Sequence, residues 1–156
     1  MEKIIKEIKL ARGILIHNGK VLLAQDIRSG QGHYFLPGGN VETGESIQRT
    51  LVREWEEELG WKVKSAGFYG CLEHKWGFHR KQDNALIEVF EMNYLFRIEA
   101  GQYLNFDPQS KEEHLHFSWM PISDLSKIRL LPEPLKGLIP DISRLNSYGI
   151  WVSTLE

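Results

Sequence analysis

The chain of 156 residues has little cysteine, little net charge and no long apolar run. Cys71 is its only cysteine, which excludes an internal disulfide and a cysteine-based zinc site and favours a reducing compartment. The formal net charge of −2 supplies no basic surface, so no nucleic-acid partner is expected. No apolar run approaches a membrane span, and the charged residues of segment 1–10 leave no room for the core of a signal peptide. These absences predict a soluble, cytoplasmic protein that has no membrane partner.

Repeats, low-complexity tracts and linkers are absent too, which predicts one domain over residues 1–156. Short apolar runs intermix with helical segments, as in an α+β fold. The strands are expected at 11–16 and 21–24, joined by a hairpin at Asn18-Gly19, and at 66–76, 85–98 and 114–119. The helices are expected at 46–59, after a turn at 121–125, and at 135–144, where Pro140 would break the last of them.

The strongest concentration of charge lies in residues 39–61. This segment holds six glutamates and two arginines, a local charge of −4. If residues 46–59 are helical, a step of about 100° per residue places Glu54, Glu57 and Glu58 on one arc and Glu56 on the opposite side. The apolar stripe of this helix lies beside that arc and consists of Ile47, Leu51, Trp55 and Leu59.

Carboxylates crowded beside a buried face repel one another unless a cation compensates their charge. Mg²⁺ prefers oxygen ligands and suits a site built from two or three carboxylates and substrate phosphates. A divalent metal site is therefore the leading interpretation. The alternatives are a solvated surface helix with ordinary salt bridges and a purely structural acidic helix.

A short strand and a glycine turn precede this helix. Residues 34–36 form an apolar run that stops at Pro37, Gly38 and Gly39. Glycines at such a turn let the backbone approach a ligand closely. Ser46 is the favoured N-cap, with Thr43 and Glu45 as alternatives. The order of strand, glycine loop and acidic helix favours a ligand site over a plain surface helix.

Gly39, Glu45 and residues 53–61 have the spacing of the Nudix box, and every fixed position of that motif is filled. The departures are Trp55 and Trp61, which stand where bulky aliphatic residues are usual. The chain therefore resembles the Nudix hydrolase family. This resemblance implies an α/β/α sandwich with a mixed β-sheet between helices, and cleavage of a diphosphate linkage in a nucleoside diphosphate derivative.

The resemblance also implies roles for the residues of the motif. Glu45 and Arg53 would pair and brace the loop against the helix, and Arg53 would also hold Glu57 in place. The metal would be Mg²⁺, with Mn²⁺ as an alternative. Its ligands would be the Gly39 carbonyl and the carboxylates of Glu54, Glu57 and Glu58.

One carboxylate must act as the general base or orient the attacking water. Glu57 and Glu54 are the favoured candidates, although clustered carboxylates titrate as a set and the sequence does not separate them. In this family the base is not always in the box, so Glu112 and Glu113, in a polar loop before a strand, are candidates outside it.

The residues that contact the substrate are expected on the flanking loops. Residues 74–81 combine basic and aromatic side chains between two strands, where they could stack a base and hold phosphates, or form an exposed hairpin turn. A zinc pair at His114 and His116 would lack a third ligand. The substrate-binding candidates are Arg28, His33, Trp76, Phe78, Arg80 and Glu113.

Two signatures of particular family members are missing. No proline occurs between Pro37 and Pro108, which argues against ADP-ribose, and Phe78 and His79 stand where dinucleoside-polyphosphate members carry a tyrosine. A nucleoside triphosphate or a nucleotide sugar is therefore the expected substrate. A catalytically silent nucleotide-binding or regulatory module is the alternative, which the intact carboxylate set disfavours. The oligomeric state is left open, with a homodimer among the options.

Overall fold

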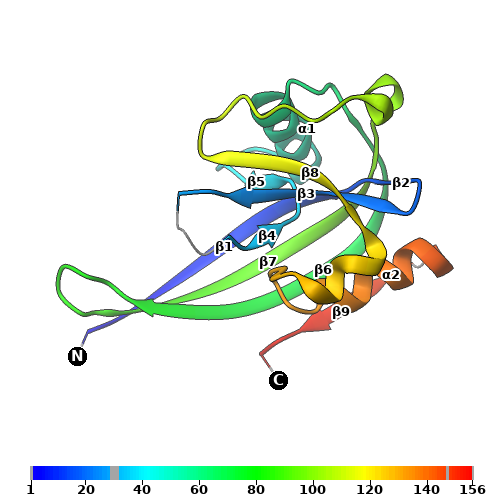
Figure 1. Cartoon of the computed structure of the whole chain (residues 1–156). Coiled ribbons are helices and arrows are strands. Elements are labelled where there is room, and N and C mark those ends of the chain that lie inside the picture. Colours follow the sequence, from blue (N-terminus) through cyan, green and yellow to red (C-terminus); the bar gives the residue numbers. More distant parts are fainter. Residues whose placement is uncertain (1, 29–31, 147, 156) are drawn as a thin grey trace.

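The computed structural model describes residues 2–28, 32–146 and 148–155, which form two β-sheets and two α-helices (Figure 1). The strands are β1 (Lys3–Ile14), β2 (Ile16–His17), β3 (Lys20–Asp26), β4 (Tyr34–Phe35), β5 (Gly38–Asn40), β6 (Lys64–His79), β7 (Leu86–Glu99), β8 (Leu115–Pro121) and β9 (Ile150–Ser153). The α-helices are α1 (Ile47–Leu59) and α2 (Leu135–Leu145), and two 3₁₀ helices are η1 (Gly101–Asn105) and η2 (Ile122–Lys127).

The larger sheet has the strand order β5-β1-β7-β6-β9. β1 runs parallel to β7. β6 is antiparallel to β7, and β5 is antiparallel to β1. In the smaller sheet β3 pairs with β2, β4 and β8. The mixed strand directions agree with the expected mixed sheet.

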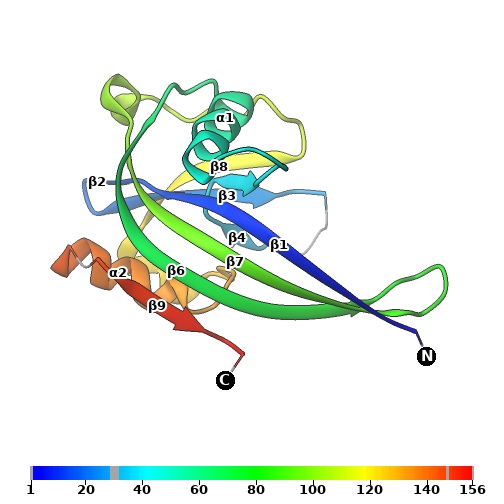
Figure 2. The ribbon, with the colours of Figure 1, turned by 180° about the vertical axis from the view of Figure 1, so that it is seen from behind.

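Two buried hydrophobic clusters lie on opposite faces of the strands: the first includes Leu22, Trp55 and Phe117, and the second includes Leu23, Leu36 and Ile139. Side chains along a strand point alternately to its two faces, and in β3 Leu22 belongs to the first cluster whereas Leu23 belongs to the second. α1 buries its apolar stripe in the first cluster, and α2 contributes Leu135, Ile139 and Ile142 to the second. Figures 1 and 2 show the two helices on opposite sides of the sheets. The expected α/β/α sandwich is confirmed.

The long hairpin of β6 and β7 corrects one prediction. Segment 74–81 was expected as a loop, but β6 continues through it to His79, which pairs with Leu86. The chain turns only afterwards, where Arg80 donates its backbone N–H to the Ala85 carbonyl at 2.9 Å. Figure 1 shows this hairpin extending beyond the rest of the molecule beside the start of β1. Pairing with β7 extends β6 beyond its apolar stretch.

Two other local predictions, a hairpin at Asn18-Gly19 and a helix break at Pro140, have opposite outcomes. The hairpin at Asn18-Gly19 is present, with both residues at positive φ, 50° and 70°, as a two-residue turn of this kind requires. The expected break at Pro140 is wrong, because α2 runs through it. An interior proline costs a helix about 3 kcal/mol. Burial of three large aliphatic side chains, each contributing about 1.5–3 kcal/mol, outweighs that cost.

Candidate active site

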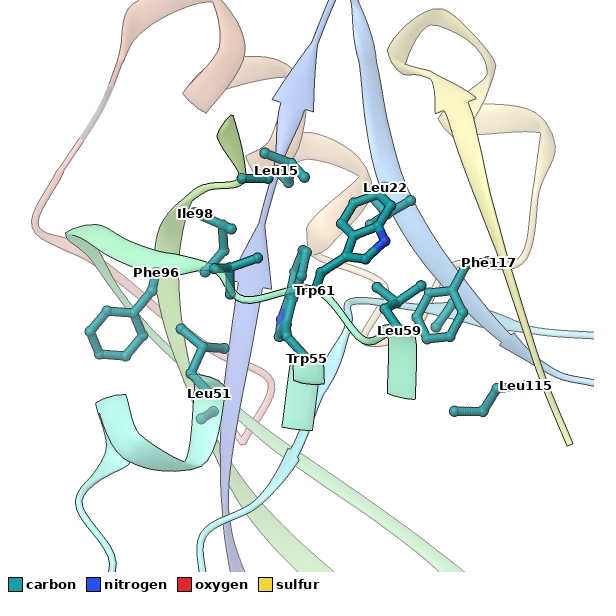
Figure 3. Close-up of a cluster of buried hydrophobic side chains, with 14 residues drawn as sticks. Leu15, Leu22, Leu51, Trp55, Leu59, Trp61, Phe96, Ile98, Leu115 and Phe117 are labelled. Atoms are coloured by element: carbon teal, nitrogen blue, oxygen red, sulfur yellow. The ribbon is translucent and has the colours of Figure 1, made fainter. Parts of the chain in front are cut away.

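Helix α1 carries the acidic face, and its ends and its buried stripe hold it in place. Ser46 is its N-cap, as expected, and accepts a hydrogen bond from the Arg49 backbone N–H at 3.2 Å. Gly60 ends the helix with φ of 70°. Trp55 is fully buried and packs near Trp61 in the first cluster, which Figure 3 shows. The two tryptophans that depart from the motif are thus core residues.

The glycine turn lies directly against this helix. A Cβ atom on Gly39 would lie 2.4 Å from Oε1 of Glu54, and one on Gly38 would lie 1.9 Å from the carbonyl oxygen of Ala11. Gly38 has no room for a side chain, because its neighbours are backbone atoms, and its φ of 141° also favours glycine, whereas a side chain at Gly39 would require the Glu54 carboxylate to move. Gly38 therefore lets β5 approach β1, and Gly39 lets the same strand bring its backbone next to the Glu54 carboxylate.

The predicted pair of Glu45 and Arg53 is present. Nε of Arg53 lies 2.7 Å from Oε2 of Glu45, and a terminal guanidinium nitrogen donates to Oε1 at 2.9 Å. The Thr50 hydroxyl also donates to Oε1. These bonds, that of Arg53 above all, lower the pKa of Glu45 to about 2. The two-pronged ion pair ties the loop before α1 to the body of the helix.

Arg53 also contacts two other carboxylates of the motif. The other terminal nitrogen, Nη1, lies 3.2 Å from Oε1 of Glu54 and 3.1 Å from Oε2 of Glu57. The predicted contact of Arg53 with Glu57 is therefore confirmed. The guanidinium partly neutralises a cluster of like charges, and its own pKa is raised, chiefly by the hydrogen bonds to Glu45.

The carboxylates of α1 differ in burial. Glu58 is buried, Glu54 is partly buried, and Glu57 keeps 53% of its side chain exposed. Burial raises the pKa of Glu58 to about 8 and also raises the pKa of Glu54. Oε2 of Glu58 is buried without a hydrogen-bond partner. Glu56 is exposed, on the opposite side of the helix as predicted.

In the described part of the chain, no three histidine, cysteine or acidic side chains are gathered closely enough to hold a metal ion. Arg53 contacts Glu54 and Glu57 instead, so the positive charge beside them comes from the chain itself. The donor set nevertheless fits a hard divalent ion, because all the donors are oxygens and one buried oxygen of Glu58 has no other partner. The assignment of Gly39, Glu54, Glu57 and Glu58 as ligands stays a prediction.

The loop before β8 closes over the end of α1. Lys111 donates its backbone N–H to the Glu58 carbonyl at 2.7 Å. The charge of Glu112 contributes to the raised pKa values of Glu54 and Glu58, whereas Glu113 is exposed. Of the two carboxylates considered outside the motif, Glu112 is therefore the one whose charge contributes to the pKa values of Glu54 and Glu58.

A cavity of about 530 Å³ is lined by Arg12 of β1 and by residues of β3, β4, β6 and β7, and no residue of α1 belongs to its lining. Arg12 donates to the Leu36 carbonyl at 3.0 Å and lies 5.6 Å from the centre of the Phe35 ring. Burial lowers the pKa of Arg12, and the nearby charges of Glu91, Glu58 and Glu54 oppose this shift. Sequence reasoning missed Arg12, although a lone arginine inside an apolar strand was a usable signal.

The structure divides the predicted substrate-binding residues into two groups. His33 and Trp76 line the cavity. Phe78 lies beside Trp76, with the ring centres 5.7 Å apart, and lines a neighbouring cavity. The remaining members are not part of the lining: Arg28 pairs with Asp26, which does line the cavity, Arg80 pairs with Asp83 at the hairpin turn, and Glu113 is exposed.

Comparison with known proteins identifies the class. A model of the NUDIX domain matches residues 7–142, so the chain belongs to the Nudix family of hydrolases, which act on pyrophosphate bonds. It is 27% identical over 119 residues to the uncharacterized Nudix hydrolase YvcI of Bacillus subtilis, which covers 76% of this chain and 69% of YvcI. No helix of the described residues is long and apolar enough to cross a membrane.

A second relative is longer than this chain. The NAD-capped RNA hydrolase NudC of Enterobacter sp. is 32% identical over 114 residues, which cover 73% of this chain but only 38% of NudC. Among solved structures, a MutT protein from Methanosarcina mazei has a similar fold, with a TM-score of 0.61 and 22% identity over 94% of this chain and 98% of that one. The similarity to MutT supports the fold alone.

Proposed function

We propose that this chain hydrolyses the diphosphate linkage of a nucleoside diphosphate derivative, with Mg²⁺ or Mn²⁺ bound at the acidic face of α1. The observation that carries the proposal is the buried Oε2 atom of Glu58, which has no hydrogen-bond partner. A buried carboxylate without a partner is costly, and a divalent cation would offset that cost. Burial disfavours the charged form of Glu58, and a cation bound beside it would restore that form.

The ligands would be the Gly39 carbonyl and the carboxylates of Glu54, Glu57 and Glu58. A divalent ion bound there would neutralise phosphate oxygens and acidify a water molecule. The pair of Glu45 and Arg53 fixes the loop that joins β5, the strand of Gly39, to α1. Arg53 also restrains Glu57, so that the most exposed of the three carboxylates stays beside the other two.

The proton of the attacking water would pass to a carboxylate oxygen of this cluster. Glu57 is the most accessible acceptor, and Glu54 is the other candidate within the motif. Glu112 acts electrostatically on Glu54 and Glu58 and is a third candidate. A negative neighbour raises the proton affinity of a carboxylate, which suits a base working near neutral pH.

A nucleoside triphosphate or a nucleotide sugar is the substrate class we propose. The cavity of about 530 Å³ beside Arg12 lies within the range of small-molecule sites and would hold one nucleoside. NudC, the longer relative, is an NAD-capped RNA hydrolase, so a compound with two nucleosides joined by a diphosphate belongs among the candidates.

The test is a phosphate-release screen with Mg²⁺, with Mn²⁺ and with a chelator. Its substrates are nucleoside triphosphates, nucleotide sugars, ADP-ribose, NAD and dinucleoside polyphosphates, with a phosphatase added to reveal monophosphate products. The wild type should cleave at least one of them only in the presence of metal. Absence of cleavage across the whole panel would leave a nucleotide-binding module as the better description.

Three variants on one helix sharpen this test. Glu54→Gln and Glu58→Gln should lower the metal-dependent rate at least tenfold, because each removes a charged ligand. Glu56→Gln makes the same chemical change on the opposite side of α1 and should keep the wild-type rate. Equal losses of rate in all three variants would show that the glutamates act only through the total negative charge of α1.

A further inference from the structure

Trp76 is a partly exposed indole held in a defined orientation at the wall of the cavity. It keeps 42% of its surface exposed, and it lies in β6. Its Nε1 donates to Oε2 of Glu91 on the neighbouring strand β7 at 3.0 Å. Its ring stacks on Phe78 with an interplanar angle of 21°. The indole is therefore restrained both at its edge and by a neighbouring ring, although much of it faces solvent.

Buried contacts behind Glu91 extend this restraint into the sheet. The other carboxylate oxygen of Glu91 accepts a hydrogen bond from Nδ2 of Asn93 at 3.1 Å. Asn93 is buried, and the same nitrogen donates to the Leu72 carbonyl of β6 at 3.2 Å. The position of the Trp76 ring is thus set by a line of hydrogen bonds across β6 and β7. A ring fixed in advance loses little conformational freedom when a ligand binds.

Another part of the cavity lining also carries planar groups. His33 and Phe35 come from the segment before the glycine turn, with their ring centres 5.9 Å apart. Arg12 approaches the Phe35 ring and lines the same cavity, and its charge interacts first with Glu91 in that cavity and then with Glu58 and Glu54 on α1. The cavity therefore combines flat aromatic walls with a cation on the side of the acidic helix.

We propose that this cavity binds the base of the substrate, with Trp76 as the stacking platform, and that Arg12 receives the adjoining phosphate. A flat base and a phosphate carried on one ribose match the aromatic walls and the guanidinium. Glu91 also lines the cavity, and it is assigned a positioning role through its hydrogen bond to the indole. The proposal rests on the proposed function for the reaction, but it assigns the nucleoside half of the substrate, rather than a sugar, to this cavity.

The test compares two ligands that differ only in the base. Binding of AMP and of ribose 5-phosphate is measured by calorimetry in the presence of Mg²⁺. The wild type should bind AMP about tenfold or more tightly, because stacking on an aromatic side chain contributes that much per base. AMP has no diphosphate linkage, so its binding is measurable whether or not the chain proves to be a hydrolase, and the two proposals fail separately.

Substitutions at Trp76 identify the platform. Trp76→Leu should remove most of the preference for AMP over ribose 5-phosphate, and Trp76→Phe should keep part of it. Trp151→Leu is the matched control, because Trp151 is 62% exposed in β9 and lies outside the cavity lining. Equal affinities of the wild type for the two ligands, or an unchanged preference in Trp76→Leu, would overturn the proposal.

Substitutions at Glu91 separate positioning from simple structural support. Glu91→Gln retains one oxygen that can accept from Nε1 of Trp76, although its NH2 group cannot accept from Nδ2 of Asn93, and it should keep most of the preference for AMP, whereas Glu91→Leu should lose it. The near-ultraviolet circular dichroism assigned to Trp76, by subtraction of Trp76→Phe, should weaken in Glu91→Leu and persist in Glu91→Gln. Loss of thermal stability with an unchanged AMP preference in Glu91→Leu would contradict the positioning role.

Discussion

The indole of Trp55 occupies the space that the absent side chain of Gly13 leaves open. A Cβ atom on Gly13 would lie 2.7 Å from Cζ2 of Trp55 and 2.7 Å from Cγ1 of Ile98. Trp55 stands where the motif usually carries an aliphatic residue, and β1 accommodates its larger volume with a glycine. The acidic helix therefore keeps its place against the sheet despite the larger side chain.

Gly13→Ala should destabilise the fold through this contact. Overpacking of a core costs about 1–3 kcal/mol, and the neighbours here are a fully buried ring and a buried isoleucine. Chemical denaturation of the variant should show a loss of that size in the free energy of unfolding.

A double substitution is the control for this prediction. Trp55→Leu creates the space that the alanine methyl needs, and Nε1 of Trp55 has no hydrogen-bond partner to lose. The loss in the double variant should therefore be smaller than the sum of the two single losses. Additive losses would show that the alanine does not act through Trp55.

The pair of Glu45 and Arg53 should make stability depend on acid pH. The pKa of Glu45 is lowered to about 2 in the folded chain, below the value of about 4.3 for an unperturbed glutamate. The pair's contribution is therefore fully present above the unfolded pKa and is lost as the pH falls from about 4.3 to about 2. Urea midpoints measured across this range should fall less steeply with acidification in Glu45→Gln than in the wild type.

Glu42→Gln is the matched control for that measurement. Glu42 also lies near Arg53, at 3.8 Å, but 70% of its side chain is exposed. An exposed pair at this distance contributes little, so this variant should keep the acid dependence of the wild type. An acid dependence unaffected by Glu45→Gln would show that other carboxylates dominate.

Glu112 should set the pH dependence of the reaction. Its negative charge contributes to the raised pKa values of Glu54 and Glu58, so its removal should lower both. A base that ionises at lower pH keeps its activity at lower pH. The acid limb of the rate profile should therefore shift to lower pH in Glu112→Gln.

Glu113→Gln is the neighbouring control, since Glu113 is exposed and belongs to the same loop. Its rate profile should overlay that of the wild type. A shared shift in both variants would indicate an effect of the loop charge as a whole. A loss of rate at every pH in Glu112→Gln alone would instead identify Glu112 as the base or as a ligand.

The sequence was informative where the pattern is local. The helix with Ser46 at its cap, the apolar stripe and the pair of Glu45 with Arg53 all follow from spacing within residues 39–61. The length of β6 and the exposure of Trp76 depend on pairing with β7, and the position of Arg12 depends on β1 lying beside β7. Such contacts join residues far apart in the chain, so periodicity does not reveal them. A purely local reading therefore assigned segment 74–81 to a loop.

The last prediction concerns the glycine at the acidic face. Because a Cβ on Gly39 would meet the Glu54 carboxylate, Gly39→Ala should displace that carboxylate and weaken metal binding. A ligand that binds only the folded state stabilises it, by about 2.7 kcal/mol at a hundredfold excess over its dissociation constant. Mg²⁺ should therefore raise the Tm of the wild type clearly and that of Gly39→Ala much less. Gly137→Ala in α2 has open space around its Cβ and should respond as the wild type does. A Tm of the wild type that does not respond to Mg²⁺ would favour a purely structural acidic helix.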